Sequence, residues 1–223
     1  LCKEKLLTKK ECESFPWGTN ARYVDYGVMY QSRYQLLKKA FVRFMANEPA
    51  DFATFCKEEA DWLEDYTLFM ALKDAHDGVA WFEWEKELKT RDEKAIAKAK
   101  EEYAEDMTFY KMLQYLFFKQ WWELKAYVNE KGIEIIGDVP IYVAGDSADV
   151  WANPSQFYLD KNLDPIDVAG CPPDAFSEDG QLWGNPLFRW DAMKWDGYSW
   201  WTKRISAMAK LYDIVRIDHF RGF

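Results

Sequence analysis

The sequence has few of the residues that bind metals. It contains 2 histidines and 4 cysteines, and their spacing matches no zinc site. The cysteines, which are Cys2, Cys12, Cys56 and Cys171, include no close-spaced pair, so we expect reduced thiols, buried or incidental, rather than a disulfide framework. A glycine-rich phosphate loop is absent as well. The sequence therefore predicts neither a metal nor an organic cofactor.

The sequence also lacks an excess of positive charge and any long apolar run. Its net charge is −9, whereas nucleic acids and anionic membranes attract clustered positive charge. No apolar stretch approaches the ~18 residues of a membrane span, and no signal peptide opens the chain. We therefore expect no nucleic-acid partner, no membrane partner and a cytoplasmic location. No pattern in the sequence indicates an oligomeric state.

Helical periodicity dominates residues 33–131. Before this block, residues 1–32 contain breaker residues and no regular period, which predicts an irregular lead-in. Apolar residues then recur every three or four positions, which predicts a helix over 33–46, a second one capped by Asp51 and a third over 65–75. A block this long is not an ordinary connection between two strands. We therefore expect a helical insertion subdomain.

The second half of this block is predicted to be one long helical region. Thr90 and Glu93 have the spacing of a capping box at its start, and we expect a break near Asp106. Aromatic residues at helical spacing are more often core than binding residues. This rule assigns three aromatic residues to the core: Phe117, Trp121 and Trp122.

Residues 132–223 have the pattern of a strand, a helix and a second strand. The strands are predicted over 133–143 and 214–217, the second of them buried, and the helix over 198–211. Such a unit pairs its strands in parallel. About 50 residues precede the helix as one long loop, and a loop of that length in a compact fold is usually functional.

Charged residues lie near the ends of both predicted strands. Side chains two positions apart on a strand share a face, so Arg216 and Asp218 should point the same way. Asp138 lies near the end of the earlier strand. The carboxyl ends of parallel strands form the active-site face of a βα barrel. From these residues alone, both an active site and a buried ion pair that only maintains packing stay open.

The surrounding residues narrow this choice. The segment Arg-Ile-Asp-His-Phe-Arg-Gly-Phe, residues 216–223, closely resembles the fourth-strand segment of the amylomaltases, also called disproportionating enzymes or 4-α-glucanotransferases, which are relatives of the α-amylases. Further segments resemble the same family in the same order, and the resemblance runs from about residue 15 to 223. These segments are residues 62–73, 116–121, 137–144, 146–154 and 181–187.

The resemblance implies an α/β fold, an incomplete (β/α)8 barrel of the TIM type with a large helical insertion. In that interpretation residues 1–32 belong to the barrel, 33–131 form the insertion, and 132–223 form the βαβ portion with a long active-site loop. The chain is then expected to be an internal piece of a longer enzyme. The family's acid/base Glu lies on the next strand, which this sequence does not reach.

The resemblance also implies a retaining 4-α-glucanotransferase, with Asp218 as nucleophile and Arg216 as its positioning partner. The expected partners are α-1,4-glucans and maltooligosaccharides, as in starch, glycogen or maltodextrin metabolism. Sugars combine apolar faces with polar rims, so we expect aromatic and polar contacts. Four residues are expected to bind substrate: Asp138, Trp183, Asn185 and His219.

Some alternatives stay open at this point. Trp183 and Asn185 can instead be purely structural residues of the loop. An α-amylase-like hydrolase would share the Arg-x-Asp motif and the covalent intermediate. A third possibility is a non-catalytic glucan-binding or helical interaction module. The isolated chain is expected to behave as such a module, and to be inactive, because it lacks the acid/base Glu.

Overall fold

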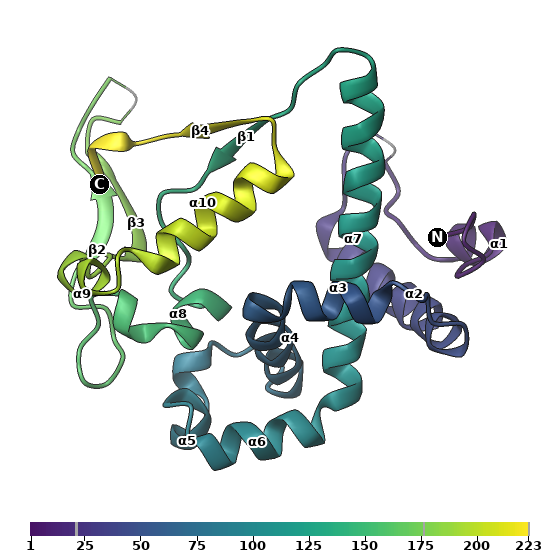
Figure 1. The fold of residues 1–223 in the computed structure, drawn as a ribbon, viewed down its shortest axis with the longest axis horizontal. Coiled ribbons are helices and arrows are strands. Elements are labelled where there is room, and N and C mark those ends of the chain that lie inside the picture. The colour runs from purple at the N-terminus through teal and green to yellow at the C-terminus, as the bar shows by residue number, and fades with distance from the viewer. Residues whose placement is uncertain (21, 176, 223) are drawn as a thin grey trace.

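A computed structural model describes residues 1–20, 22–175 and 177–222, so the last residue of the 216–223 motif lies outside the described residues. Figure 1 shows the long helix α7 crossing the molecule, with α1 and α2 on one side and β1, β4 and α10 on the other. The helices are α1 Lys9–Ser14, α2 Tyr26–Ala46, α3 Phe52–Glu58, α4 Ala60–Ala75, α5 Lys86–Lys89, α6 Glu93–Glu102, α7 Ala104–Glu130, α8 Ala148–Ala152, α9 Trp190–Trp195 and α10 Ser199–Leu211. The strands are β1 Ile136–Val139, β2 Val168–Cys171, β3 Gln181–Pro186 and β4 Ile214–Ile217.

Side-chain caps explain where several helices begin. Thr8 and Glu11 form a capping box at α1, and Asp25 accepts a hydrogen bond from the backbone N–H of Val28 at α2. These two helices correct the prediction of an irregular segment up to residue 32. At α6 the capping residue is Asp92, not Thr90 as predicted.

The breaks between helices also differ in part from the predictions. Asp51 makes no side-chain cap at α3 and instead accepts a hydrogen bond from the Tyr115 hydroxyl at 2.8 Å. A turn at Glu59 separates α3 from α4, so α4 begins earlier than the predicted residue 65. The break predicted near residue 106 is present three residues earlier, at Tyr103 between α6 and α7.

One apolar core holds the helices of the N-terminal half together. Phe44, Phe52 and Tyr115 pack with ring centroids 5.0 to 5.8 Å apart. The buried members of this helical core are Leu6, Leu7, Leu36, Ala40, Phe41, Phe44, Phe52, Phe109, Tyr110, Met112, Tyr115 and Leu116. The assignment of Phe117 and Trp122 to the core is wrong, because both side chains are exposed, whereas Trp121 is half-buried.

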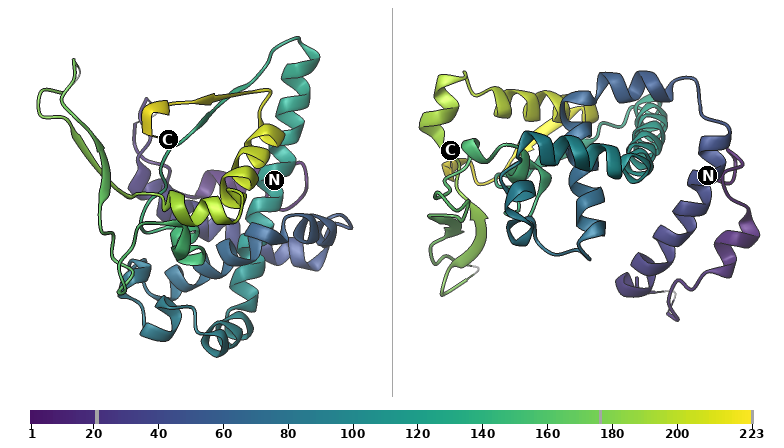
Figure 2. Two further views of the ribbon diagram at one scale, coloured as in Figure 1. Left: turned by 60° about the vertical axis from the view of Figure 1, so that its left-hand side comes forward. Right: turned by 90° about the horizontal axis from the view of Figure 1, so that it is seen from below.

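A second core lies under the strand-bearing half. Its centre is the fully buried Trp151 of α8, whose indole N–H donates to the carbonyl oxygen of Leu88 at 3.0 Å. Phe188 and Trp201 pack edge to face at 5.1 Å beside it. Helix α4 packs against both α7 and α8, and Met70 of α4 contacts both cores. The two halves are therefore joined through α4, with α1 and α2 at the end farthest from the C-terminus (Figure 2).

The predicted parallel βαβ unit is confirmed. β1 and β4 pair in parallel, with Asp138 opposite Arg216, and α10 precedes β4. The prediction of a buried second strand is wrong, because Ile214 and Ile217 are 44% and 43% exposed. In the described residues β1 and β4 pair only with each other, so neither strand has a neighbour on its other edge.

The long segment before α10 is more ordered than predicted. β2 and β3 pair antiparallel as a hairpin, and α8 and α9 flank it. The segment before β2 is joined to the residue after β3, because the backbone N–H of Tyr158 donates to the carbonyl oxygen of Leu187 at 2.7 Å. None of the helices in the described residues has the length and apolar character needed to span a membrane.

Candidate functional site

The strand register brings three charged side chains together. Arg216 donates from Nη1 to Oδ2 of Asp138 at 2.8 Å, and its Nη2 lies 2.9 Å from Oδ2 of Asp218. Both carboxylates thus share one guanidinium group at the carboxyl ends of β1 and β4. We call these residues the Asp138–Arg216–Asp218 cluster. The charged residues near the ends of the two predicted strands are thus brought together.

An acidic residue at the opposite end of the strands stabilises this register. Asp213 accepts hydrogen bonds from the backbone N–H of Ile135 at 2.8 Å and from the Asn129 amide at 2.9 Å. Lys125 lies 3.1 Å from its other oxygen. These contacts, the Ile135 bond foremost, lower the pKa of Asp213 to about 2. Asp213 therefore ties α7, β1 and β4 together away from the cluster.

The environment of Asp218 favours its ionised form. The backbone N–H of His219 donates to Oδ1 of Asp218 at 2.9 Å, and His219 has a left-handed backbone with φ of 48°. That hydrogen bond, and then the charge of Arg216, hold the pKa of Asp218 below its usual value. A carboxylate that stays ionised can act as a nucleophile.

An aromatic side chain from the hairpin lies beside this acid. The ring centroids of Trp183 and His219 are 4.8 Å apart and tilted by 56°. The ring centroid of Tyr142, which follows β1, lies 6.1 Å from that of Trp183. The hairpin thus delivers Trp183 to the neighbourhood of the cluster, where a sugar face can stack on an aromatic ring.

Asn185 has a clear structural contact. Its amide donates to the carbonyl oxygen of Val143 at 2.8 Å and so ties β3 to the segment that follows β1. Gly184, between Trp183 and Asn185, has φ of +77°, a conformation that glycine adopts without strain. This supports the structural alternative for Asn185 without testing a role in substrate binding.

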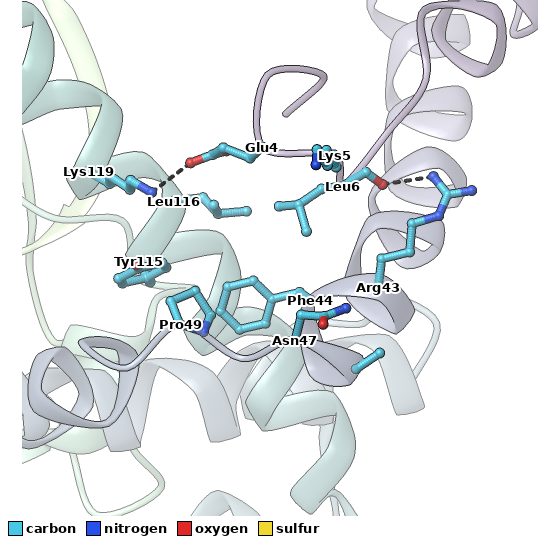
Figure 3. A pocket seen from close by; sticks show the side chains of 11 residues that line it. Glu4, Lys5, Leu6, Arg43, Phe44, Asn47, Pro49, Tyr115, Leu116 and Lys119 are labelled. Atoms are coloured by element: carbon cyan, nitrogen blue, oxygen red, sulfur yellow. Dashed lines mark hydrogen bonds and ion pairs between the residues drawn. The ribbon is translucent and has the colours of Figure 1, made fainter.

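The cluster is open to solvent. The side chains of Asp138, Arg216 and Asp218 are 54%, 55% and 43% exposed. A separate cavity of about 520 Å³ lies between the N-terminal segment, α2 and α7 (Figure 3). It is lined by none of the predicted site residues. Among the described residues, no group of three or more His, Cys, Asp or Glu side chains is arranged to hold a metal ion.

The sequence analysis missed one residue that supports the cluster. Arg204 of α10 donates to the carbonyl oxygens of Pro140 at 2.5 Å and Ile141 at 3.5 Å, directly after β1. Its guanidinium lies 5.2 Å and 5.0 Å from the ring centroids of Trp200 and Trp201. Burial lowers the pKa of Arg204. An arginine beside the apolar stripe of a helix was the available signal.

A parallel βαβ unit with a carboxylate–arginine cluster at the carboxyl ends of its strands, and aromatic rings beside it, is the arrangement of α/β proteins whose site lies at the carboxyl face of the sheet. The family model for 4-alpha-glucanotransferase matches residues 1–223, and the chain belongs to this family.

Bacterial 4-alpha-glucanotransferases are similar to this chain over its whole length. The chain is 48% identical to a 4-alpha-glucanotransferase of Clostridium butyricum, over 100% of this chain and 46% of the relative. It is 49% identical to the one from Thermus thermophilus, over 99% of this chain and 44% of the relative. The chain thus spans less than half the length of these curated relatives.

Solved structures agree as well. The amylomaltase from Streptococcus agalactiae in complex with acarbose matches with a TM-score of 0.94 and 42% identity, over 99% of this chain and 45% of that one. The amylomaltase from Corynebacterium glutamicum matches with a TM-score of 0.64 and 22% identity, over 88% of this chain and 25% of that one, which supports the fold alone.

Proposed function

We propose that this chain is the nucleophile-bearing part of a 4-α-glucanotransferase. The observation that carries the proposal is the shared guanidinium: Arg216 bridges Asp138 and Asp218 at the carboxyl ends of two parallel strands, in a chain of this family. The enzyme transfers α-1,4-glucan segments to the 4-hydroxyl of an acceptor glucan or glucose, with retention. The full-length protein is this chain together with the remainder of such an enzyme.

In this mechanism Asp218 attacks the anomeric carbon of the donor glucan and forms a covalent glycosyl ester. Arg216 holds the Asp218 carboxylate in position, and the backbone N–H of His219 helps to keep it ionised. Retaining enzymes place their second carboxyl group about 5–5.5 Å from the nucleophile, where it first protonates the leaving oxygen and then activates the acceptor. We assign that role to a Glu outside this sequence. Asp138 is not a candidate for the proton donor, because its carboxylate forms an ion pair with Arg216.

The glucan is held by Asp138, Trp183, Asn185 and His219 in this proposal. Asp138 shares Arg216 with the attacking carboxylate, and Nε2 of His219 lies 3.9 Å from Oδ2 of Asp218. The ring of Trp183 lies at a tilt beside that of His219. The solved relative in complex with acarbose supports an α-glucan or maltooligosaccharide as the substrate. Asn185 contributes through β3, whose position it fixes by its bond to Val143.

The architecture we propose is an incomplete (β/α)8 barrel. Residues 1–32 and 132–223 belong to the barrel and residues 33–131 form a helical insertion. The parallel pairing of β1 with β4, and the helices α2 to α7 before it, support this division. The cytoplasmic location expected from the sequence stays a prediction.

The decisive experiment replaces Asp218 by Asn in the full-length protein. Asn keeps the size of the side chain, but a neutral amide cannot form the glycosyl ester. We expect the variant to fold and to lose redistribution of maltotriose into longer glucans and glucose. Asp61→Asn, at an exposed position on α4, is the matched control and should keep full activity.

Product analysis separates this proposal from its rival. Longer glucans formed from maltotriose indicate transfer, whereas shorter products alone indicate an α-amylase-like hydrolase. A folded Asp218→Asn variant, checked by circular dichroism, that still redistributes glucans near the wild-type rate would refute the assignment of the nucleophile.

A further inference from the structure

Two of the four cysteines lie close together. The Sγ atoms of Cys2 and Cys12 are 3.8 Å apart although the residues are 10 positions apart in the chain. Both are free thiols, with Cys2 exposed and Cys12 half-buried. Their spacing in the sequence suggested no pair, because the approach depends on how the N-terminal segment folds back on itself.

Local hydrogen bonds hold both cysteines in place. The backbone N–H of Lys5 donates to the carbonyl oxygen of Cys2 at 3.2 Å, and that of Cys12 donates to the carbonyl oxygen of Thr8 at 3.2 Å. The indole N–H of Trp17 donates to the carbonyl oxygen of Cys12 at 2.7 Å. The proximity of the two thiols is therefore a consequence of an ordered backbone on both sides.

The segment between the two cysteines is attached to the helical core. Glu11 receives two hydrogen bonds from Arg43 of α2, at 2.6 and 2.9 Å, and Arg43 also donates to the carbonyl oxygen of Leu6 at 2.9 Å. Glu4 forms an ion pair with Lys119 of α7 at 2.8 Å. The side chain of Leu6 is buried in the helical core.

The same segment forms a wall of the 520 Å³ cavity. Figure 3 shows Glu4, Lys5 and Leu6 along one side of it, facing Phe44 and Tyr115. A constraint on residues 2–12 would therefore constrain that wall and the contacts with α2 and α7.

We propose that Cys2 and Cys12 are a modification site: under oxidising conditions they form a reversible disulfide that closes the loop of residues 2–12, which packs against α2 and α7. The Sγ atoms need to approach from 3.8 Å to the ~2.05 Å of a disulfide, which side-chain rotation within one loop can accomplish. The oxidant is a low-molecular-weight disulfide. In proteins of reducing compartments such a bond is transient and redox-sensing rather than a permanent brace.

The exchange balances in two steps. The thiolate of Cys2, the more exposed residue, attacks one sulfur of glutathione disulfide, forms a mixed disulfide and releases one glutathione thiolate. The thiolate of Cys12 then attacks the Cys2 sulfur and releases the second. Two protein thiols are oxidised, one glutathione disulfide is reduced to two glutathione molecules, and the two thiol protons end on them. This step is independent of the proposed glucanotransferase function.

The experiment treats the reduced full-length protein with glutathione disulfide, blocks remaining thiols with iodoacetamide and maps the non-reduced tryptic peptides by mass spectrometry. We expect peptides containing Cys2 and Cys12 to be linked, and Cys56 and Cys171 to be alkylated. The oxidised protein should melt a few degrees higher than the reduced one, because the closed loop restricts the unfolded chain. Dithiothreitol should reverse both changes.

Matched variants complete the test. Cys2→Ser and Cys12→Ser should each abolish the link and the thermal shift, whereas Cys56→Ser and Cys171→Ser should keep both. Two variants at the pair ensure a result even if one of them folds poorly. Glutathione adducts on Cys2 without a Cys2–Cys12 link, a link to Cys56, or a link that forms without any thermal shift would each overturn the proposal.

Discussion

At the scale of single residues, one guanidinium group organises the site. Arg216 reaches Asp138 with one terminal nitrogen and Asp218 with the other, at 2.8 and 2.9 Å. A guanidinium group is planar and holds its donors in a fixed fork. The positions of the two carboxylates are therefore coupled to each other through a rigid group, which a lysine on its flexible stem could not reproduce.

This coupling predicts a change in the pH profile. The lowered pKa of Asp218 keeps the carboxylate ionised, and thus active, as the pH falls. In the full-length protein, Arg216→Gln removes the second cause of that lowering, so the pKa of Asp218 rises. The acid limb of kcat/KM should move to higher pH, and the rate should fall. Some lowering should persist, because the His219 backbone N–H, its largest cause, is retained.

The measurement is kcat/KM for maltotriose as a function of pH, whose acid limb reports the free enzyme. Lys203→Gln is the control, because it also removes one positive charge. Lys203 is an exposed residue of α10 that pairs with Asp61 of α4, away from the cluster. An Arg216→Gln variant with a lower rate but an unmoved acid limb would contradict the electrostatic role.

At the scale of elements, the site depends on the close approach of β1 to the end of α10. Gly137 of β1 lies against the ring of Tyr212, the residue that ends α10: a Cβ at position 137 would lie 2.0 Å from a ring carbon. The same ring packs edge to face on Trp121 of α7 at 5.6 Å. Gly137 is therefore required by this close approach, one position before Asp138.

This predicts that Gly137→Ala destabilises the protein by about 1–3 kcal/mol, as overpacking of a filled site does. Urea unfolding of the full-length protein measures the effect. In a Tyr212→Ala background the same change should cost much less, because the ring that clashes is gone. An equal cost in both backgrounds would show that the Tyr212 ring is not the obstacle.

Elements with local signals were predictable from the sequence, and those that depend on distant partners were not. The helix predicted over 198–211 and the strand over 214–217 match α10 and β4. The β2–β3 hairpin was missed because its strands are short and contain Gly170 and Gly184. The exposure of β4 depends on which strands lie beside it, which its own residues do not encode.

In the candidate site as well, residues with local signals were predictable and residues with distant partners were not. The alternation of a strand was enough to place Arg216 and Asp218 on one face, and the register then added Asp138. Arg204 was missed because its partners are backbone carbonyl groups about 60 positions earlier in the chain. The roles of Asp138, Trp183, Asn185 and His219 stay predictions, since their positions fit substrate binding without testing it.

At the scale of the whole molecule, the chain has two apolar cores that are joined, whereas the two-stranded sheet of β1 and β4 is exposed. Helix α4 joins the helical core to the core around Trp151. β1 and β4, by contrast, pair only with each other in the described part of the chain, and Ile136 of β1 and Phe220 after β4 are exposed. The chain spans less than half the length of the curated relatives from Clostridium butyricum and Thermus thermophilus.

We therefore predict that isolated residues 1–223 are inactive whereas the full-length protein is active. A retaining transfer needs a proton donor beside the nucleophile, and its loss typically costs about 10²–10⁴-fold in rate. The carboxylate of Asp138, which shares Arg216 with Asp218, is held by that ion pair and cannot take this role. The test incubates equal amounts of both proteins with maltotriose and follows glucose and longer glucans, with circular dichroism to confirm that the isolated chain is folded. Redistribution by the isolated chain at a rate near that of the full-length protein would mean that a second catalytic carboxyl group lies within residues 1–223, and the assignment of the acid/base to a residue outside them would have to be abandoned.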